Sequence, residues 1–128
     1  MGELCICGSK KTFKKCCDRF LNLQQAAKTP EQLMRSRYSA YALGGYGEYL
    51  LKTWLPSMAQ GLDTLELSQK TNEWFRLDVL DKSQQGDNGM VEFIAYYKSD
   101  DGAEHTMQEK SVFKRIAGQW LYVGGEVS

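Results

Sequence analysis

The chain has 128 residues, of which 42% are hydrophobic and 25% charged, a composition typical of an ordinary globular protein. Lysine plus arginine equals aspartate plus glutamate, at 16 each, which argues against a protein that binds nucleic acid over its whole surface. No stretch approaches ~18 consecutive apolar residues, so we expect no membrane span. The first residues lack a basic region followed by an apolar run, and we therefore expect a cytoplasmic protein.

All four cysteines lie within the first seventeen residues, as Cys5, Cys7, Cys16 and Cys17. A disulfide framework would distribute cysteines along the domain, whereas a metal site clusters them. Zinc prefers four tetrahedral nitrogen or sulfur ligands, and a closed set of four thiolates is typical of a structural site. Gly8 and Ser9 favour a tight turn around the metal, and residues 14–23 are expected to form a short helix with the second cysteine pair in its first turn. The pattern predicts one structural Zn²⁺.

Two other states of the cysteines are compatible with the sequence. Disulfides between Cys5 and Cys7 and between Cys16 and Cys17 would close very small, strained rings. The other two pairings are sterically conceivable but need an oxidising compartment. Four free and inert thiols are the remaining alternative. Because a segment of about twenty residues cannot bury a core of its own, a bound metal would have to supply its folding free energy.

Cations and one aromatic residue surround the predicted zinc site, namely Lys10, Lys11, Phe13, Lys14, Lys15 and Arg19. These side chains form a candidate partner-binding surface for an acidic protein or for RNA phosphates. Alternatively, the cations only offset the negative charge of a tetrathiolate centre and keep the module hydrated. The sequence leaves both interpretations open.

Eight residues of this segment match a known motif, namely Cys5, Cys7, Gly8, Ser9, Lys11, Phe13, Cys16 and Cys17. Through them the segment resembles the SEC-C motif, a zinc-binding element named for the C-terminal tail of the SecA translocation motor. The usual pattern is Cys-Pro-Cys-Gly-Ser-Gly-Lys, an aromatic residue, and then Cys-Cys or Cys-His. Here Ile6 replaces the proline and Lys10 replaces the second glycine, while the ligands are retained. The SecA tail binds the acidic chaperone SecB and has been linked to the ribosome. The resemblance therefore implies a protein partner, with free nucleic acid the less favoured one.

Three helices are predicted after a linker at residues 24–29. The first, over residues 29–45, begins with the capping box Thr-Pro-Glu-Gln and ends at a glycine pair. The second is expected over residues 46–55 and is stopped by Pro56. A shorter third helix begins at Asp63, which heads another capping box.

From Asn72 onward the apolar residues alternate with a period of two, which is typical of strands. Turn residues at 86–89 and 100–102 and a break at Gly118 separate the predicted strands, which cover residues 72–79, 91–97, 104–116 and 120–123. Short turns between successive strands predict an antiparallel meander. Helices followed by strands predict an α+β domain over residues 30–128, with helices covering one face of a bent sheet, preceded by a zinc module at 1–23.

Four stretches of the second part carry a family resemblance, namely residues 33–41 (Leu-Met-Arg-Ser-Arg-Tyr-Ser-Ala-Tyr), 49–54, 91–93 and 118–120. Through them the second part resembles the YchJ-type family of uncharacterised bacterial proteins. Members resemble the nuclear-transport-factor-two-like, cystatin-related cone fold, a curved antiparallel sheet wrapped on helices that often encloses a pocket. The resemblance implies this cone-shaped fold and a metal site rather than a particular activity.

Arg37 lies on the apolar stripe of its helix, and a buried arginine needs a partner. One interpretation places it in the pocket of the cone, where it would bind an anionic ligand with Tyr38 or Tyr41. The other pairs it with Glu92 or Glu109 in a structural ion pair.

His105, the one histidine of the sequence, is a candidate general base in the same pocket, paired with Glu109. The alternative is an exposed histidine near the start of a strand. No nucleophile, catalytic carboxylate pair or metal trio can be named beside it, so we predict no catalytic residue.

These observations favour a non-enzymatic cytoplasmic adaptor, in which the zinc module docks a protein and the cone holds a ligand or a second partner. An enzyme or small-molecule carrier acting in the pocket is the alternative. Zinc storage is less favoured, because a closed tetrathiolate site exchanges its metal poorly.

Overall fold

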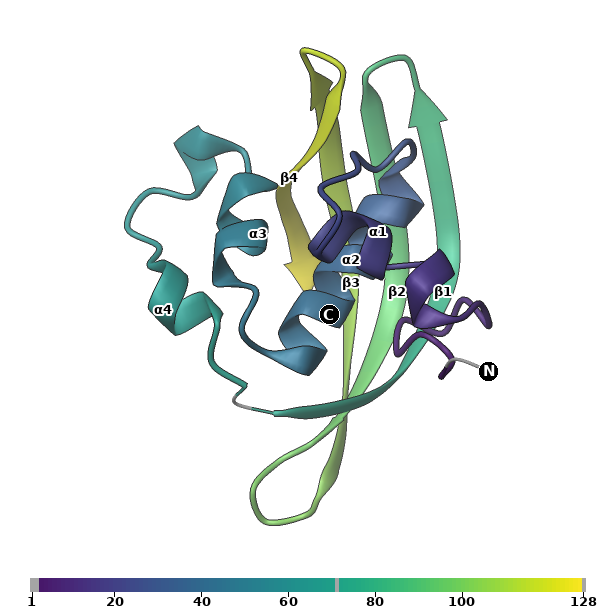
Figure 1. The fold of residues 1–128 in the computed structure, drawn as a ribbon, viewed down its shortest axis with the longest axis vertical. Helices are drawn as coiled ribbons and strands as arrows, with labels where there is room; N and C mark the ends of the chain where they lie inside the picture. The colour runs from purple at the N-terminus through teal and green to yellow at the C-terminus, as the bar shows by residue number, and fades with distance from the viewer. Residues whose placement is uncertain (1–2, 71, 128) are drawn as a thin grey trace.

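The computed structural model describes residues 3–70 and 72–127. Helices precede a four-stranded antiparallel sheet, which confirms the predicted α+β class (Figure 1). None of the described helices is long and apolar enough to cross a membrane. In chain order the elements are η1 (Phe13–Lys15), α1 (Asp18–Leu21), α2 (Pro30–Leu43), α3 (Gly47–Lys52), η2 (Pro56–Met58), α4 (Thr64–Leu67), β1 (Glu73–Gln85), β2 (Asn88–Lys98), β3 (Glu104–Ile116) and β4 (Gln119–Val127).

The four strands lie in the order β1-β2-β3-β4, and every neighbouring pair is antiparallel, as the short turns predicted. On β2 the buried side chains Val91, Phe93 and Ala95 share the face that packs against the helices. Register shifts interrupt the pairing of β1 with β2 after Trp74 and after Val79. Such irregularities increase the local twist and bend a strand, as a curved sheet requires.

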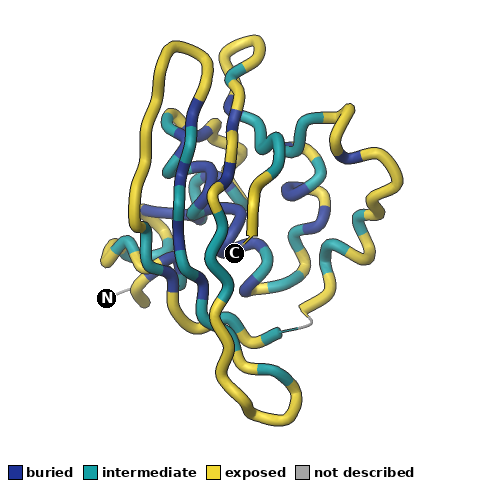
Figure 2. Tube along the Cα trace, turned by 180° about the vertical axis from the view of Figure 1, so that it is seen from behind, coloured by how far each residue is buried: buried dark blue, intermediate teal, exposed yellow. Residues whose placement is uncertain are grey.

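Helix α2 lies over the sheet, and the buried stretches of the chain gather around it in the middle of the molecule, while the hairpin ends are exposed (Figure 2). Its start follows the predicted capping box. Thr29 Oγ1 accepts a hydrogen bond from Gln32 N–H at 3.1 Å, and the Gln32 side chain accepts one from Lys28 N–H at 2.8 Å. Gly44, with φ at 73°, follows the last helical residue.

The helix predicted over residues 46–55 is shorter than expected and ends at Lys52, as α3. The residues that follow pair with β4 instead. Leu55 N–H donates to the Tyr122 carbonyl at 2.8 Å, and Tyr122 N–H donates to the Thr53 carbonyl at 2.7 Å. This pairing satisfies the same backbone groups that another helical turn would use, and it joins residues far apart in the sequence.

A two-residue turn at Gly86 and Asp87 joins β1 to β2, although the sequence predicted a turn over residues 86–89. Gly89 belongs to β2, and it lies directly under Pro30, the first residue of α2. A Cβ atom on Gly89 would overlap the Pro30 ring and lie 3.3 Å from Trp120. The glycine therefore allows the start of α2 to approach the sheet closely.

We predict that Gly89→Ala lowers the free energy of unfolding by about 1–3 kcal/mol, because the added methyl group overpacks the helix–sheet contact. Urea denaturation would measure the change. Gly124→Ala is the matched control, because its Cβ would meet no atom within 4 Å and its φ is not positive. We expect the control to stay within about 0.5 kcal/mol of the original protein. Equal stability of the two variants would contradict this account of the packing.

Candidate metal centre and adjacent cavity

Cys5 and Cys7 lie on a small hairpin near the N-terminus. Leu4 and Thr12 form an isolated antiparallel bridge, and Cys5 N–H donates to the Lys11 carbonyl at 2.8 Å. Gly8 N–H donates to the Cys5 carbonyl at 3.2 Å, with φ of Gly8 at 80°. This turn confirms the expected role of the glycine, because the left-handed conformation costs it no strain.

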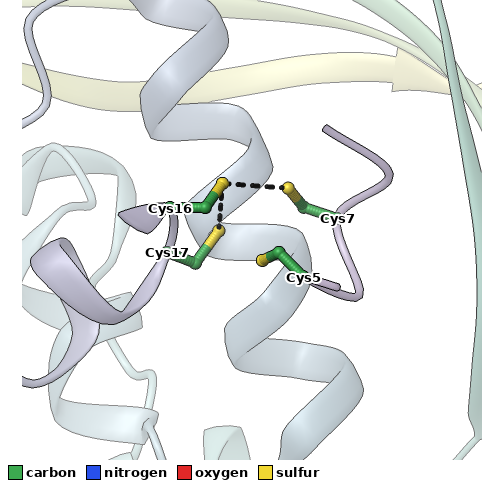
Figure 3. A group of neighbouring side chains, drawn as sticks. All are labelled: Cys5, Cys7, Cys16 and Cys17. Carbon is green, nitrogen blue, oxygen red and sulfur yellow. Dashed lines mark hydrogen bonds between the residues drawn. The ribbon is translucent and has the colours of Figure 1, made fainter. Parts of the chain in front are cut away.

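Cys16 and Cys17 come from a second segment, which differs from the single helix predicted over residues 14–23. A short 3₁₀ helix, η1, ends before Cys16, and α1 begins after Cys17. The φ and ψ angles of Cys16 are −126° and −113°, which are not helical, so the two helical pieces cannot be continuous. The break turns both sulfur atoms toward Cys5 and Cys7 (Figure 3).

The four sulfur atoms have the spacing of a tetrahedral metal site. All four lie within 4.8 Å of one another, with 3.5 Å between Cys7 and Cys16 and 4.0 Å between Cys16 and Cys17. Zinc–sulfur bonds of about 2.3 Å in a tetrahedron place the sulfurs about 3.8 Å apart. Disulfide sulfurs would lie about 2 Å apart, and all four cysteines are free. The four-cysteine cluster is therefore suited to one metal ion.

The cluster is buried against α2, which supplies a polar contact that the sequence analysis missed. Ser39 Oγ donates to Cys17 Sγ at 3.2 Å and lies 3.8 Å from Cys5 Sγ. Arg35 Nη1 donates to the Cys7 carbonyl at 2.5 Å. The available signal was the position of Ser39 within a helix whose neighbouring residues are apolar, where a fully buried hydroxyl needs a partner.

The close approach of the sulfurs and their burial oppose ionisation of Cys17 in the absence of a cation. Hydrogen bonds from Cys5 and Cys7, together with desolvation, raise the pKa of Cys17 well above its ordinary value. Cys7 and Cys17 have exposed fractions of 0% and 1%. A divalent metal would replace the shared protons and neutralise the buried thiolates.

The predicted partner-binding residues divide into two groups. Lys10, Lys11, Lys14 and Lys15 are exposed, and none of them forms an ion pair within residues 3–70 and 72–127. Arg19 and Phe13 are half-buried and support the module. Arg19 Nε donates to the Cys16 carbonyl at 3.0 Å, and its guanidinium lies over the Phe20 ring, while Phe13 packs against the core.

Arg37, Tyr38 and Tyr41 line a cavity of about 320 Å³ between α2 and the sheet. His105 does not belong to this cavity. It is exposed near the start of β3, where its ring stacks on Tyr97 at 5.2 Å and its Nε2 lies 3.0 Å from Ser99 Oγ. The register of the β2–β3 hairpin places His105 there, so the structure separates this candidate base from the other three predicted pocket residues.

Arg37 is buried without the predicted ion pair. Its Nη1 donates to the Leu50 carbonyl and to Thr53 Oγ1, both at 2.7 Å, at the end of α3. The guanidinium Cζ lies 4.8 Å from the Trp54 ring centroid and 4.7 Å from that of Tyr122. Burial lowers the pKa of the Arg37 guanidinium.

Neither of the two expected carboxylates contacts Arg37. Glu92 accepts a hydrogen bond from Gln108, and Glu109 accepts from Ser111 and Tyr122. The arginine is therefore held by a carbonyl, a hydroxyl and two rings rather than by a carboxylate.

Comparison with known proteins places these features in a family. Residues 3–19 match the SEC-C motif, and residues 29–125 match the description "YchJ, middle NTF2-like domain". A UPF0225 protein of Vibrio parahaemolyticus is 38% identical over 98% of this chain and 75% of its own length. A UPF0225 protein of Corynebacterium glutamicum is 37% identical over 99% of both chains. The solution structure of a SEC-C motif containing protein from Rhodopseudomonas palustris is 37% identical, covers 98% of both chains and has a TM-score of 0.88.

The fold and the cysteine cluster together define a SEC-C metal-binding module joined to an NTF2-like α+β domain. The chain belongs to the UPF0225 family of YchJ-like proteins.

Replacing one ligand tests the metal centre. We predict that Cys17→Ser abolishes stoichiometric metal binding, because a neutral hydroxyl is a far poorer zinc ligand than a thiolate. Native mass spectrometry of the reduced protein would measure the stoichiometry. As a comparison, Ser39→Ala keeps all four ligands but loses the hydrogen bond to Cys17, and it should still bind one ion with roughly 10–100-fold lower affinity. Stoichiometric binding by Cys17→Ser would show that the cluster is not the ligand set.

The backbone conformation of Lys10 explains why the SEC-C motif usually has a glycine at this position. Its φ is 69°, in the left-handed region, which costs a side-chain-bearing residue about 1–2 kcal/mol. Glycine removes this strain but adds roughly 0.5–1 kcal/mol of unfolded-state entropy, so a small net gain remains. We predict that Lys10→Gly raises the apparent metal affinity roughly two- to fivefold in a chelator competition. Lys11→Gly removes the same charge at a residue with ordinary φ, and a similar gain there would contradict the strain argument.

Proposed function

We propose that this protein is a zinc-dependent adaptor of the cytoplasm, whose cysteine module docks an acidic segment of a partner protein. The observation that carries the proposal is the set of four exposed lysines, free of ion pairs within the described ranges, on the two segments that hold the buried cysteines. Cations needed only to support the cluster would lie against it, as Arg19 does.

Zinc is the metal that fits this ligand set best. Four thiolates are soft ligands, and a tetrahedral set of four sulfurs is typical of zinc or of iron–sulfur sites. Within residues 3–70 and 72–127 the ligand set consists of four cysteine sulfurs, and a closed tetrathiolate set of this kind supports a structural role rather than a catalytic one. When bound, zinc would supply the free energy that holds two short segments together.

The charge of the chain is divided unevenly, although its total is zero. Residues 3–23 contain five lysines and arginines and two acidic residues, whereas the remainder contains 11 basic and 14 acidic residues. Even after the −2 charge of a tetrathiolate zinc centre, the module stays slightly positive and the rest of the chain is negative. An acidic partner would therefore be attracted to the module and repelled elsewhere.

A groove of about 270 Å³ beside the cluster could receive an acidic side chain. Lys11 and Arg19 from the module line it, together with Glu31 and Arg35 from the first turns of α2. Glu31 is already paired with Arg35 at 2.9 Å and with Lys82 at 2.5 Å, so its charge is offset. The unpaired positive charge of the groove thus comes from the module.

We predict that the double charge reversal Lys14→Glu and Lys15→Glu weakens binding to an acidic polypeptide by about tenfold or more. Fluorescence anisotropy with labelled poly-glutamate at several salt concentrations would measure the affinity, and the loss should shrink at high salt. The matched control is Lys110→Glu with Lys114→Glu, which makes the same change in net charge on exposed positions of β3. The control should bind as the original protein does.

Two outcomes of this experiment would contradict the proposal. Equal losses in both double variants would mean that only net charge matters. Tighter binding to a single-stranded RNA of equal charge than to poly-glutamate would identify nucleic acid as the partner. Both double variants should keep one zinc ion, because no ligand is changed.

A further inference from the structure

The cavity under α2 is large enough for a small organic molecule. Its volume of about 320 Å³ lies at the lower end of the range typical for small-molecule sites, which suits roughly 9 to 15 non-hydrogen atoms. Its walls are mainly apolar and include two indoles, Trp54 and Trp74, and two methionines, Met34 and Met107. Such walls favour a flat aromatic molecule, because rings stack well on indoles and thioethers adapt to them.

Two opposite charges line this cavity without touching each other. Among the described residues, Arg37 donates to the Leu50 carbonyl and to Thr53 Oγ1 through Nη1, and Tyr41 is a further polar neighbour of its guanidinium in the cavity, so Nε and Nη2 remain for a ligand. Glu109 accepts hydrogen bonds at Oε2 from Ser111 and from Tyr122, the latter at 3.0 Å, which leaves Oε1.

Tyr122 keeps the two charges apart. Its hydroxyl binds Glu109, and its ring lies under the guanidinium of Arg37. Residues 3–70 and 72–127 contain no ion pair that joins Arg37 to a carboxylate.

These two charges restrict the charge of the ligand. An anion that approached Arg37 would also meet Glu109, and a cation that approached Glu109 would also meet Arg37, in surroundings of low dielectric where each repulsion is strong. An uncharged ligand with one acceptor and one donor would satisfy both groups at once. Charge-assisted hydrogen bonds of this kind are the strong ones, and they fix the orientation of a ligand.

We propose that the cavity binds an uncharged, planar aromatic molecule whose edge carries a carbonyl acceptor for Arg37 next to an N–H donor for Glu109, as an aromatic amide or lactam does. The rings and methionines contact the body of the ligand, and the two charged groups form hydrogen bonds with its polar edge. This site is separate from the docking surface of the cysteine module, and neither proposal depends on the other.

Three probes of nearly equal size test the proposal on the unmodified protein: benzamide, benzoate and benzylammonium. Methionine methyl groups labelled with ¹³C report the site by NMR, because Met34 and Met107 line the cavity whereas Met58 and Met90 do not. We expect benzamide to shift the Met34 and Met107 signals, with an affinity at least about tenfold higher than that of either ion. The Met58 and Met90 signals should not move.

Glu109→Gln tests the charge argument directly. Removal of the carboxylate should raise the affinity for benzoate about tenfold, so that the preference for the amide disappears. His105→Ala lies outside the cavity and should leave all three affinities unchanged. A wild-type preference for benzoate, equal affinities for the three probes, or no shift of Met34 and Met107 with any probe would overturn the proposal, and these readings do not depend on the folding of a variant.

Discussion

The structure depends on one interaction, the convergence of four cysteine sulfurs on the buried side of helix α2. The segments that carry them are short: a hairpin of a few residues, one turn of 3₁₀ helix and one turn of α-helix. Elements of this size do not persist alone in water. They are joined to the domain through the hydroxyl of Ser39 and through Arg35. The cysteines also belong to the same buried cluster as Leu33 and Met34, so a metal bound there would contribute to the packing of α2 as well.

Helix α2 connects the two sites of the molecule. Ser39 faces the sulfurs, whereas Arg37 and Tyr38 line the cavity above the sheet. Arg37 and Ser39 can serve different sites because side chains two residues apart on a helix point about 200° apart. The residues after α3 complete the cavity, since their pairing with β4 brings Thr53 and Trp54 to Arg37. The cavity therefore follows from long-range pairing and not from any one element.

Local signals in the sequence were sufficient for the features that depend on neighbouring residues. The capping box predicted the start of α2, the turn at residues 100–102 and the break at Gly118 predicted the bounds of β3, and the short turns predicted the meander. The spacing of the cysteines, with the motif around them, identified the four residues whose sulfurs converge. The division into a module at 1–23, a linker at 24–29 and a domain at 30–128 remains a prediction. Ala27 is buried and Trp120 Nε1 donates to the Lys28 carbonyl, so the end of this segment contacts the domain, while residues 24–26 are exposed.

Features set by distant contacts could not be predicted in the same way. Nothing near residues 53–55 indicates that they pair with Tyr122, so the second helix was predicted too long. For the same reason one of the two interpretations of Arg37 paired it with Glu92 or Glu109, while the structure supplies the carbonyl of Leu50 and the hydroxyl of Thr53. His105 was placed in the pocket because histidine is a common general base. The register of the β2–β3 hairpin instead puts it on the surface.

Whether the four cysteine sulfurs share one metal ion can be measured by ¹¹³Cd NMR of the cadmium-substituted protein. Cadmium replaces zinc in thiolate sites, and scalar coupling between the metal and cysteine β-protons identifies each ligand through its bonds. We expect one cadmium signal, coupled to the β-protons of all four cysteines. A protein that takes up no cadmium, or couplings to fewer than four cysteines, would contradict this expectation.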